Sequence, residues 1–178
     1  MPSPRANIQN LSAYTPGEQL DTTIVTKLNT NENPYPPSPK VMDAVRNLAA
    51  EKLRVYPPPL AQPFREAAAK LHDVKSENII ATNGGDELLR LLLTCYCEPT
   101  GESGRGGIGV TDPTYSLYPV LAAIHDTPVV TVDRADDFSL GDDTIARWNE
   151  AGCAVGMIVN PHAPTAVSLY TSDAADDL

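Results

Sequence analysis

The sequence has little positive charge and no long hydrophobic run, and each shortage excludes a class of protein. Its 178 residues include 13 Lys and Arg against 23 Asp and Glu, a formal net charge of −10. This balance argues against binding to nucleic acids or anionic membranes, because both attract clustered Lys and Arg. No apolar stretch approaches the roughly 18 residues of a membrane-spanning helix. The richest stretch, at 88–97, is interrupted by Arg90 and Thr94.

Cysteine is also scarce. Three Cys, an odd number, do not make a disulfide framework, and the first ten residues lack the apolar stretch of a signal peptide. We therefore expect a cytoplasmic protein. The scattered His72, His125 and His162 lack metal-ligand spacing, so each is interpreted as a surface or satisfied residue. Cys95 and Cys97 have no second ligand pair and are predicted to belong to the core, so no metal site is expected.

Proline, by contrast, is abundant and unevenly placed. The chain has 17 Pro, nearly twice the average usage, and eleven of them fall at or before Pro63. The segments 31–40 and 55–63 cannot form regular helices or strands, because Pro lacks an N–H group and restrains the residue before it. Between them, the apolar spacing predicts one helix over 41–53. The first third is thus predicted to be an extended arm that carries a helix.

After Pro63 the apolar pattern changes to alternating strands and helices. The predicted helices are 63–72, 87–97, 115–124 and 142–151, and the predicted strands or strand-like runs are 78–82, 108–111, 129–132 and 154–159. Strands that alternate with helices of about ten residues indicate an α/β fold with a largely parallel sheet.

The junction Thr82-Asn-Gly-Gly-Asp-Glu87 is the most informative local feature. A strand-like run ends, two glycines follow, and an acidic residue opens a helix. The N–H groups at such a helix start, together with the helix dipole, can hold a phosphate. The alternative is a simple turn in which Asp86 caps the helix. Both interpretations stay open on this segment alone.

Two other junctions follow predicted strands directly. Asp112-Pro-Thr-Tyr115 and Asn160-Pro-His-Ala-Pro-Thr165 come where ligands bind in open α/β sheets, just past the strand ends. Tyr115 could stack on a planar ligand, and the Asn160 amide could hydrogen-bond one. The alternatives are a packed tyrosine and an ordinary Asn-Pro turn.

One glycine motif has the wrong context for dinucleotide binding. Residues 104–109 match G-x-G-x-x-G, but they follow a helix and lead into a strand. The dinucleotide fingerprint requires the opposite order, so we interpret this segment as a loop and a dehydrogenase is disfavoured.

The order of these motifs along the chain resembles that of histidinol-phosphate aminotransferases, a family of fold-type-I pyridoxal-phosphate enzymes. The resemblance covers roughly residues 8–165. Besides the three junctions above, it rests on Leu11-Ser-Ala-Tyr14-Thr-Pro-Gly17, Lys27-Leu-Asn-Thr-Asn-Glu-Asn-Pro34 and Val55-Tyr56-Pro57. It implies the N-terminal arm, part of the small domain, and a truncated large domain with a parallel-type sheet.

The resemblance also implies residues for the cofactor, pyridoxal 5'-phosphate. The backbone at Gly85 and Asp86 would hold its phosphate, Tyr115 would stack on its ring, and Asn160 would hydrogen-bond its 3-hydroxyl oxygen. Tyr56 would reach into the partner subunit of a homodimer and bind that site's phosphate.

For the substrate, the resemblance implies contacts in the arm. Tyr14 and the loop of Asn31, Glu32 and Asn33 would lie over the substrate and recognise its imidazole and phosphate end. The alternative for this Pro-rich arm is a segment that clasps the dimer.

The implied reaction moves an amino group between L-glutamate and imidazole-acetol phosphate, in L-histidine biosynthesis. Such enzymes need a Schiff-base lysine and an aspartate on the pyridine nitrogen. Neither occurs in a matching context. The five lysines are Lys27, Lys40, Lys52, Lys70 and Lys75. The sequence therefore offers no catalytic residue, and we expect this chain by itself to be inactive.

The resemblance stops at Ala166, where the family has Gly. We predict an arm and small-domain segment at 1–62, the first half of the cofactor-binding domain at 63–165, and a non-native tail at 166–178. Two alternatives remain. One is another fold-type-I enzyme, such as a threonine-phosphate decarboxylase or an aromatic aminotransferase. The other is a non-catalytic binding module built from half the fold.

Overall fold

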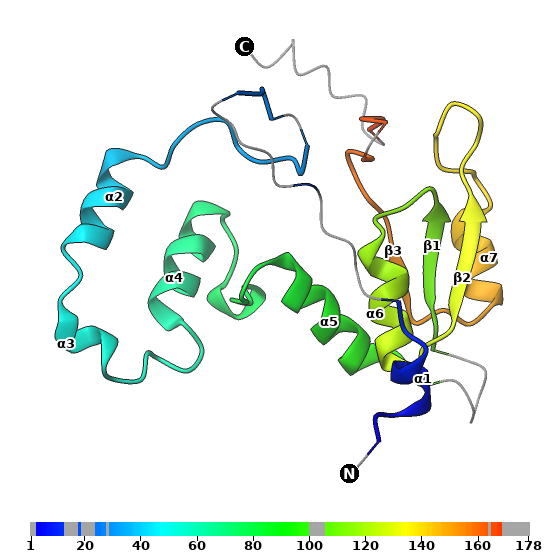
Figure 1. Cartoon of the computed structure of the whole chain (residues 1–178), viewed down its shortest axis with the longest axis horizontal. Coiled ribbons are helices and arrows are strands. Elements are labelled where there is room, and N and C mark those ends of the chain that lie inside the picture. The colour runs from blue at the N-terminus through cyan, green and yellow to red at the C-terminus, as the bar shows by residue number, and fades with distance from the viewer. Residues whose placement is uncertain are drawn as a thin grey trace. The chain divides into compact units, whose positions relative to one another are not determined.

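A computed structural model describes residues 3–12, 18, 24–27, 29–99, 106–163 and 165–168. The chain divides into two compact units (Figure 1). Unit 1 comprises residues 1–14 and 83–178, and unit 2 comprises residues 15–82. The domain organisation proposed from the sequence, with a boundary after residue 62, stays a prediction.

Unit 1 is built on a three-stranded parallel sheet. Its strands are β1 (Ile108–Asp112), β2 (Val129–Asp133) and β3 (Val155–Met157), in the order β2-β1-β3. Ile108 of the central strand pairs with Val129 on one side and with Val155 on the other. The predicted strands at 108–111, 129–132 and 154–159 are confirmed, and the parallel sheet agrees with the predicted α/β class.

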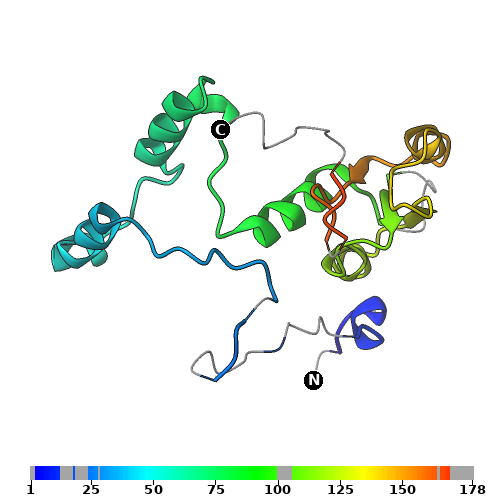
Figure 2. The same ribbon diagram turned by 90° about the horizontal axis from the view of Figure 1, so that it is seen from above.

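Helices cover both faces of this sheet. They are α5 (Gly85–Tyr96), α6 (Leu117–His125) and α7 (Thr144–Glu150), and the short α1 (Ala6–Gln9) contacts α6. Ile108 and Val110 point to one face, where they pack with Leu93 of α5 and Leu121 of α6. Figure 2 shows α6 and α7 on opposite sides of the strands. The predicted helices at 87–97, 115–124 and 142–151 are confirmed within a few residues.

The second face of the sheet is shaped by glycine. A Cβ added at Gly109 would lie 2.4 Å from the Trp148 ring, and one at Gly156 would lie 2.9 Å from it. Trp148 of α7 is only 3% exposed. The absence of side chains at these two positions therefore lets the indole lie directly against β1 and β3.

Unit 2 consists of short helices. They are α2 (Pro39–Arg46), α3 (Ala50–Leu53), α4 (Gln62–Leu71) and the 3₁₀ turn η1 (Ser76–Asn78). The predicted helix at 63–72 is confirmed as α4. The prediction of one helix over 41–53 is wrong, because α2 ends at Arg46 and Ala49 is extended, with φ −66° and ψ 132°. Asn47, a weak helix former whose side chain competes for backbone groups, stands at the break.

The strand predicted at 78–82 is also absent. η1 occupies residues 76–78, and Ile79 continues in an extended conformation, with φ −108° and ψ 127°. A strand requires a hydrogen-bonded neighbour, and in the part of the chain that the structure describes only β1, β2 and β3 form a sheet. Ile79 therefore has the backbone conformation of a strand residue without the hydrogen-bonded ladder.

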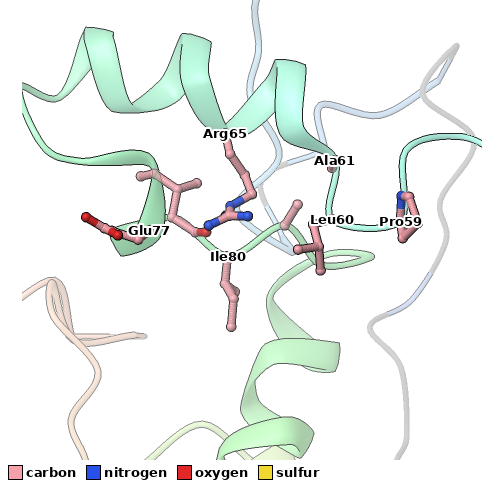
Figure 3. Close-up of a pocket in the computed structure, with 8 residues that line it drawn as sticks. Pro59, Leu60, Ala61, Arg65, Glu77 and Ile80 are labelled. Carbon is pink, nitrogen blue, oxygen red and sulfur yellow. Dashed lines mark hydrogen bonds between the residues drawn. The ribbon is translucent and has the colours of Figure 1, made fainter.

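Arg65 holds α4 to η1 and to Ile79, the residue after it. Its Nε donates to the carbonyls of Ser76 at 3.1 Å and Ile79 at 2.8 Å, and its Nη2 donates to Ser76 at 2.8 Å. Figure 3 shows Arg65 reaching across a hollow of about 290 Å³ that Leu60 and Ile80 also line.

Unit 2 has almost no core. Among its described residues only Ala69 is buried, and apolar side chains such as Phe64 and Ile80 are more than half exposed.

The prediction that both Cys95 and Cys97 belong to the core is wrong for Cys95, whereas Cys97 packs against the core of unit 1. Cys95 is exposed and Cys97 is half-buried. Leu93 is fully buried, and two residues further along a helix the side chain has turned by roughly 200°. Burial raises the pKa of the Cys97 thiol, and the neighbouring Cys153 raises it further.

The described residues contain neither a membrane-spanning helix nor a cluster of metal ligands. None of their helices combines the length and the apolar character that a membrane crossing requires. Their His, Cys, Asp and Glu side chains also form no group of three or more that could hold a metal ion.

Candidate functional site

The candidate ligand residues of unit 1 lie at the carboxyl edge of its sheet. Tyr115 follows β1 and Asn160 follows β3, and parallel strands end at the same edge. The start of α5 lies toward this edge too, because the other end of α5 is tied to the strand starts. There the Glu98 N–H donates to the Gly106 carbonyl at 3.3 Å. Tyr115 and Asn160 thus lie at the edge where open α/β sheets bind ligands, and Gly85 and Asp86 lie at the end of α5 that is directed away from the strand starts.

The start of α5 has the geometry of an open anion site. The helix begins at Gly85, and its N-cap residue is Gly84, with φ 85° and ψ 173°, a conformation that suits glycine. A Cβ added at Gly84 or Gly85 would meet no atom within 4 Å. The first turn therefore faces open space with glycine backbone, which suits close approach of a phosphate.

The competing interpretation of this junction, with Asp86 as the helix cap, is wrong. Asp86 is the second residue of the helix, and no side chain caps the helix at its N-cap position. Its carboxylate lies in the first turn, where the helix dipole stabilises negative charge. The Asn83 N–H instead donates to the carboxylate of Glu87, which also lies in the first turn of the helix. The phosphate role of Gly85 and Asp86 stays a prediction.

Tyr115 is half-buried and partly packed. Its ring meets the Tyr118 ring edge to face, with centroids 5.5 Å apart and an interplanar angle of 87°. It also lies against the hydrophobic core. Burial raises the pKa of the Tyr118 phenol. The contact with Tyr118 holds the Tyr115 ring from one side, so the packing interpretation is confirmed and stacking on a ligand stays a prediction.

Asn160 is exposed on the loop after β3. The Ser168 hydroxyl donates to its Oδ1 at 3.4 Å. Close to Tyr115, the Thr114 hydroxyl is buried and has no hydrogen-bond partner among the described residues. This edge of the sheet therefore combines an amide, a phenol and a hydroxyl within two loops.

The remaining predicted residues lie in unit 2 or outside the described residues. Tyr56 is 99% exposed. In the loop of Asn31, Glu32 and Asn33 all three residues are exposed, and Asn33 Oδ1 accepts from the Tyr35 N–H at 2.9 Å. Tyr14 falls outside the described residues.

Glu32 of that loop forms an ion pair with Lys27, which precedes the loop. The hydrogen bond from Lys27 lowers the pKa of the Glu32 carboxyl, so this group is ionised at neutral pH. The ion pair joins the two ends of the segment 27–32.

Sequence reasoning missed Arg134, which is buried just after β2. Its Nη1 donates to the Phe138 carbonyl at 2.8 Å, and its Nε donates to the Thr111 hydroxyl at 3.1 Å. Burial lowers the pKa of its guanidinium, which stays charged at neutral pH. The signal available in the sequence was an arginine at the end of a predicted strand. His162 was interpreted as a surface or satisfied residue, and it is buried with both ring nitrogens bonded.

Comparison with known proteins agrees with this geometry. A model of the family described as aminotransferase class I and II matches residues 23–174. Histidinol-phosphate aminotransferase 1 of Burkholderia pseudomallei is 38% identical over 169 residues, which cover 93% of this chain and 45% of that protein. The chain therefore spans less than half the length of this curated relative.

Solved structures of aminotransferases are also similar to this chain. The histidinol-phosphate aminotransferase of Sinorhizobium meliloti, solved in complex with pyridoxal-5'-phosphate, has a TM-score of 0.65 and 26% identity, covering 76% of this chain and 35% of that one. A Thermus thermophilus aspartate aminotransferase double mutant has a TM-score of 0.72 over 92% of this chain and 46% of that one. Its 19% identity supports the fold alone. The predicted fold-type-I class and the resemblance to histidinol-phosphate aminotransferases are confirmed, and the chain belongs to the class I and II aminotransferase family.

Proposed function

We propose that this chain is part of a pyridoxal-phosphate-dependent histidinol-phosphate aminotransferase, in which unit 1 binds the cofactor. The observation that carries the proposal is the 38% identity to such an enzyme over 93% of the chain. The arm motif Lys27-Leu-Asn-Thr-Asn-Glu-Asn-Pro34 also resembles that of the histidinol-phosphate branch of the class I and II aminotransferases. The whole enzyme would be a cytoplasmic homodimer that moves an amino group between L-glutamate and imidazole-acetol phosphate.

The residues of unit 1 fit the phosphate, ring and hydroxyl of this cofactor. The open glycine backbone at the start of α5 suits a phosphate, because N–H groups and the helix dipole both favour an anion there. The half-buried Tyr115 offers an aromatic face, and the exposed Asn160 offers an amide. When bound, pyridoxal phosphate supplies the electron sink for amino transfer.

Each of these candidate residues would contact a different part of the cofactor. The first turn of α5 would anchor the phosphate, so that the ring is held at a fixed distance from the helix. Tyr115, supported from the side by Tyr118, would keep the ring flat against its own. The hydrogen bond from Ser168 orients the Asn160 amide, whose N–H group would donate to the 3-hydroxyl oxygen. Together these contacts would orient the reacting carbon and exclude water from one face of the ring.

The arm would bind the substrate. The Lys27–Glu32 ion pair ties the loop of Asn31, Glu32 and Asn33 to Lys27, five residues before Glu32. We propose that this loop and Tyr14 contact the imidazole and phosphate end of the substrate. Tyr56, which is almost fully exposed, would bind the cofactor phosphate in the partner subunit.

The substrate class can be tested in a full-length protein that carries this segment. With 2-oxoglutarate as acceptor, we expect histidinol phosphate to exceed phenylalanine and aspartate as amino donor by at least about 100-fold in kcat/KM. A site built to hydrogen-bond a polar group rejects analogues that lack it by such factors. The measurement is glutamate formation with each donor. Preference for phenylalanine, or release of carbon dioxide from threonine phosphate, would show that the protein belongs to a different branch.

A further inference from the structure

A hydrogen-bonded network links the loops that follow all three strands of unit 1. At its centre His162 is 1% exposed. Its Nε2 lies 3.0 Å from the Pro113 carbonyl oxygen, and its Nδ1 lies 2.7 Å from the Thr165 hydroxyl. Pro113 is two residues before Tyr115, and His162 is two residues after Asn160. One imidazole therefore joins the two loops that carry the candidate ring-binding and hydroxyl-binding residues.

The partners of His162 determine its tautomer. A carbonyl oxygen can only accept, so Nε2 must carry the proton that is donated to Pro113. In the neutral ring Nδ1 is then an acceptor, and the Thr165 hydroxyl donates to it. The same hydroxyl oxygen accepts from the Val167 N–H at 3.4 Å. Every polar atom of this chain of bonds thus has a partner of the correct kind.

A second set of hydrogen bonds links the Pro113 carbonyl to Arg134, which follows β2. Arg134 Nε donates to the Thr111 hydroxyl at 3.1 Å, and that hydroxyl donates to the Pro113 carbonyl at 3.3 Å. Arg134 Nη2 also lies 3.5 Å from the carbonyl oxygen of Val159, the residue before Asn160. Within the described part of the chain neither Arg134 nor His162 forms an ion pair. Arg134 therefore acts here through neutral oxygen atoms.

The loop after β3 depends on these contacts. β3 ends at Met157, so the sheet ladder does not hold Asn160. Beyond the ring, the His162 N–H donates to the Val167 carbonyl at 2.8 Å, and the Ala166 N–H donates to the His162 carbonyl at 2.6 Å. His162 is thus the point where the loop is fastened to itself and to the loop after β1.

We propose that His162 is a positioning residue that sets the loop of Asn160 against the loop of Tyr115, and that it does so as the neutral Nε2–H tautomer. Its effect on pyridoxal phosphate rests on the function proposed above. Its effect on the two loops does not.

The test uses the whole 178-residue chain, which has only three histidines. In ¹H–¹⁵N spectra of histidine-labelled protein without cofactor, we expect His162 to show one tautomer, with the proton on Nε2. His162→Phe keeps a ring but no hydrogen bonds, and it should shift the resonances of Tyr115 and of the Asn160 side-chain amide. His72→Phe is the matched control, because His72 is exposed in unit 2 and should leave both unchanged.

A second variant keeps the inference testable if His162→Phe does not fold. Thr165→Val removes the donor to Nδ1 at nearly constant volume and should shift the Nδ1 resonance of His162 while the Pro113 carbonyl keeps the proton on Nε2, whereas Thr165→Ser should leave the Nδ1 resonance unchanged. With pyridoxal phosphate as the probe, Thr165→Val should bind about fivefold to tenfold more weakly than Thr165→Ser, the effect of losing about one hydrogen bond.

The outcomes separate this inference from the proposed function. A proton on Nδ1, averaged tautomer signals, or unchanged Tyr115 and Asn160 resonances in a folded His162→Phe protein would overturn it. If the unmodified chain fails to bind pyridoxal phosphate, the proposed function fails, and the cofactor-free spectra still decide the role of His162.

Discussion

Replacing Gly109 with alanine is expected to destabilise unit 1 by about 3 kcal/mol, the upper end of the usual cost of overpacking a core. The added Cβ would lie 2.4, 2.5 and 2.7 Å from three atoms of the Trp148 ring. The ring has little room to move, because Trp148 is 3% exposed and Gly109 is on the central strand. Urea unfolding followed by the fluorescence of this single tryptophan measures the change.

Gly85→Ala is the matched control. Its Cβ would meet no atom within 4 Å, and alanine favours a helix more than glycine does. We expect its free energy of unfolding to equal or exceed that of the unmodified chain. If Gly109→Ala were as stable as Gly85→Ala, the packing of α7 against the sheet described above would be incorrect.

The second large effect concerns the lysines. We expect the 178-residue chain, mixed with pyridoxal phosphate and glutamate, to transfer no amino group and to form no specific lysine adduct. All five lysines fall between residues 27 and 75, and none of them lies in the sequence context that the family resemblance implies for a Schiff-base lysine. Amino transfer requires a lysine that binds the cofactor covalently and shuttles the proton.

Borohydride reduction followed by peptide mass analysis measures this prediction. Low, scattered modification of several exposed lysines is the expected background, and an equal concentration of free lysine peptide sets its level. Stoichiometric modification of one lysine, together with formation of 2-oxoglutarate, would contradict the prediction.

Much of the fold of unit 1 could be predicted from local patterns. The strands at Ile108–Asp112 and Val129–Asp133 are short apolar runs, and the helices between them have helical periodicity. Parallel strands require such crossover helices, so the alternation itself indicated the sheet type. The order of the strands, with β1 between β2 and β3, is not contained in those patterns.

Three of the predictions were wrong, each for a different physical reason. Residues 78–82 have strand-like composition, but a ladder needs a partner strand, which no local pattern supplies. The helix predicted over 41–53 ignored Asn47, whose side chain competes with helical hydrogen bonds. Cys95 was assigned to the core because its helix is apolar, although its direction on the helix turns it outward.

The candidate site likewise contains residues whose positions follow from local sequence patterns and residues whose positions do not. Tyr115 and Asn160 could be predicted because each follows a strand, and strand ends are where α/β folds bind ligands. Arg134 and His162 could not, since their partners Thr111 and Pro113 are 23 and 49 residues away in sequence. Such contacts exist only once the strands lie side by side.

Titration of the 178-residue chain with pyridoxal phosphate, followed by backbone ¹H–¹⁵N spectra, tests the central claim most directly. We expect saturable binding that shifts Gly85, Asp86, Tyr115 and Asn160 together, and we expect inorganic phosphate to reverse the shifts at Gly85 and Asp86 first. Saturable shifts confined to unit 2, or no saturable shift in unit 1, would contradict the claim that this edge of the sheet is the cofactor site.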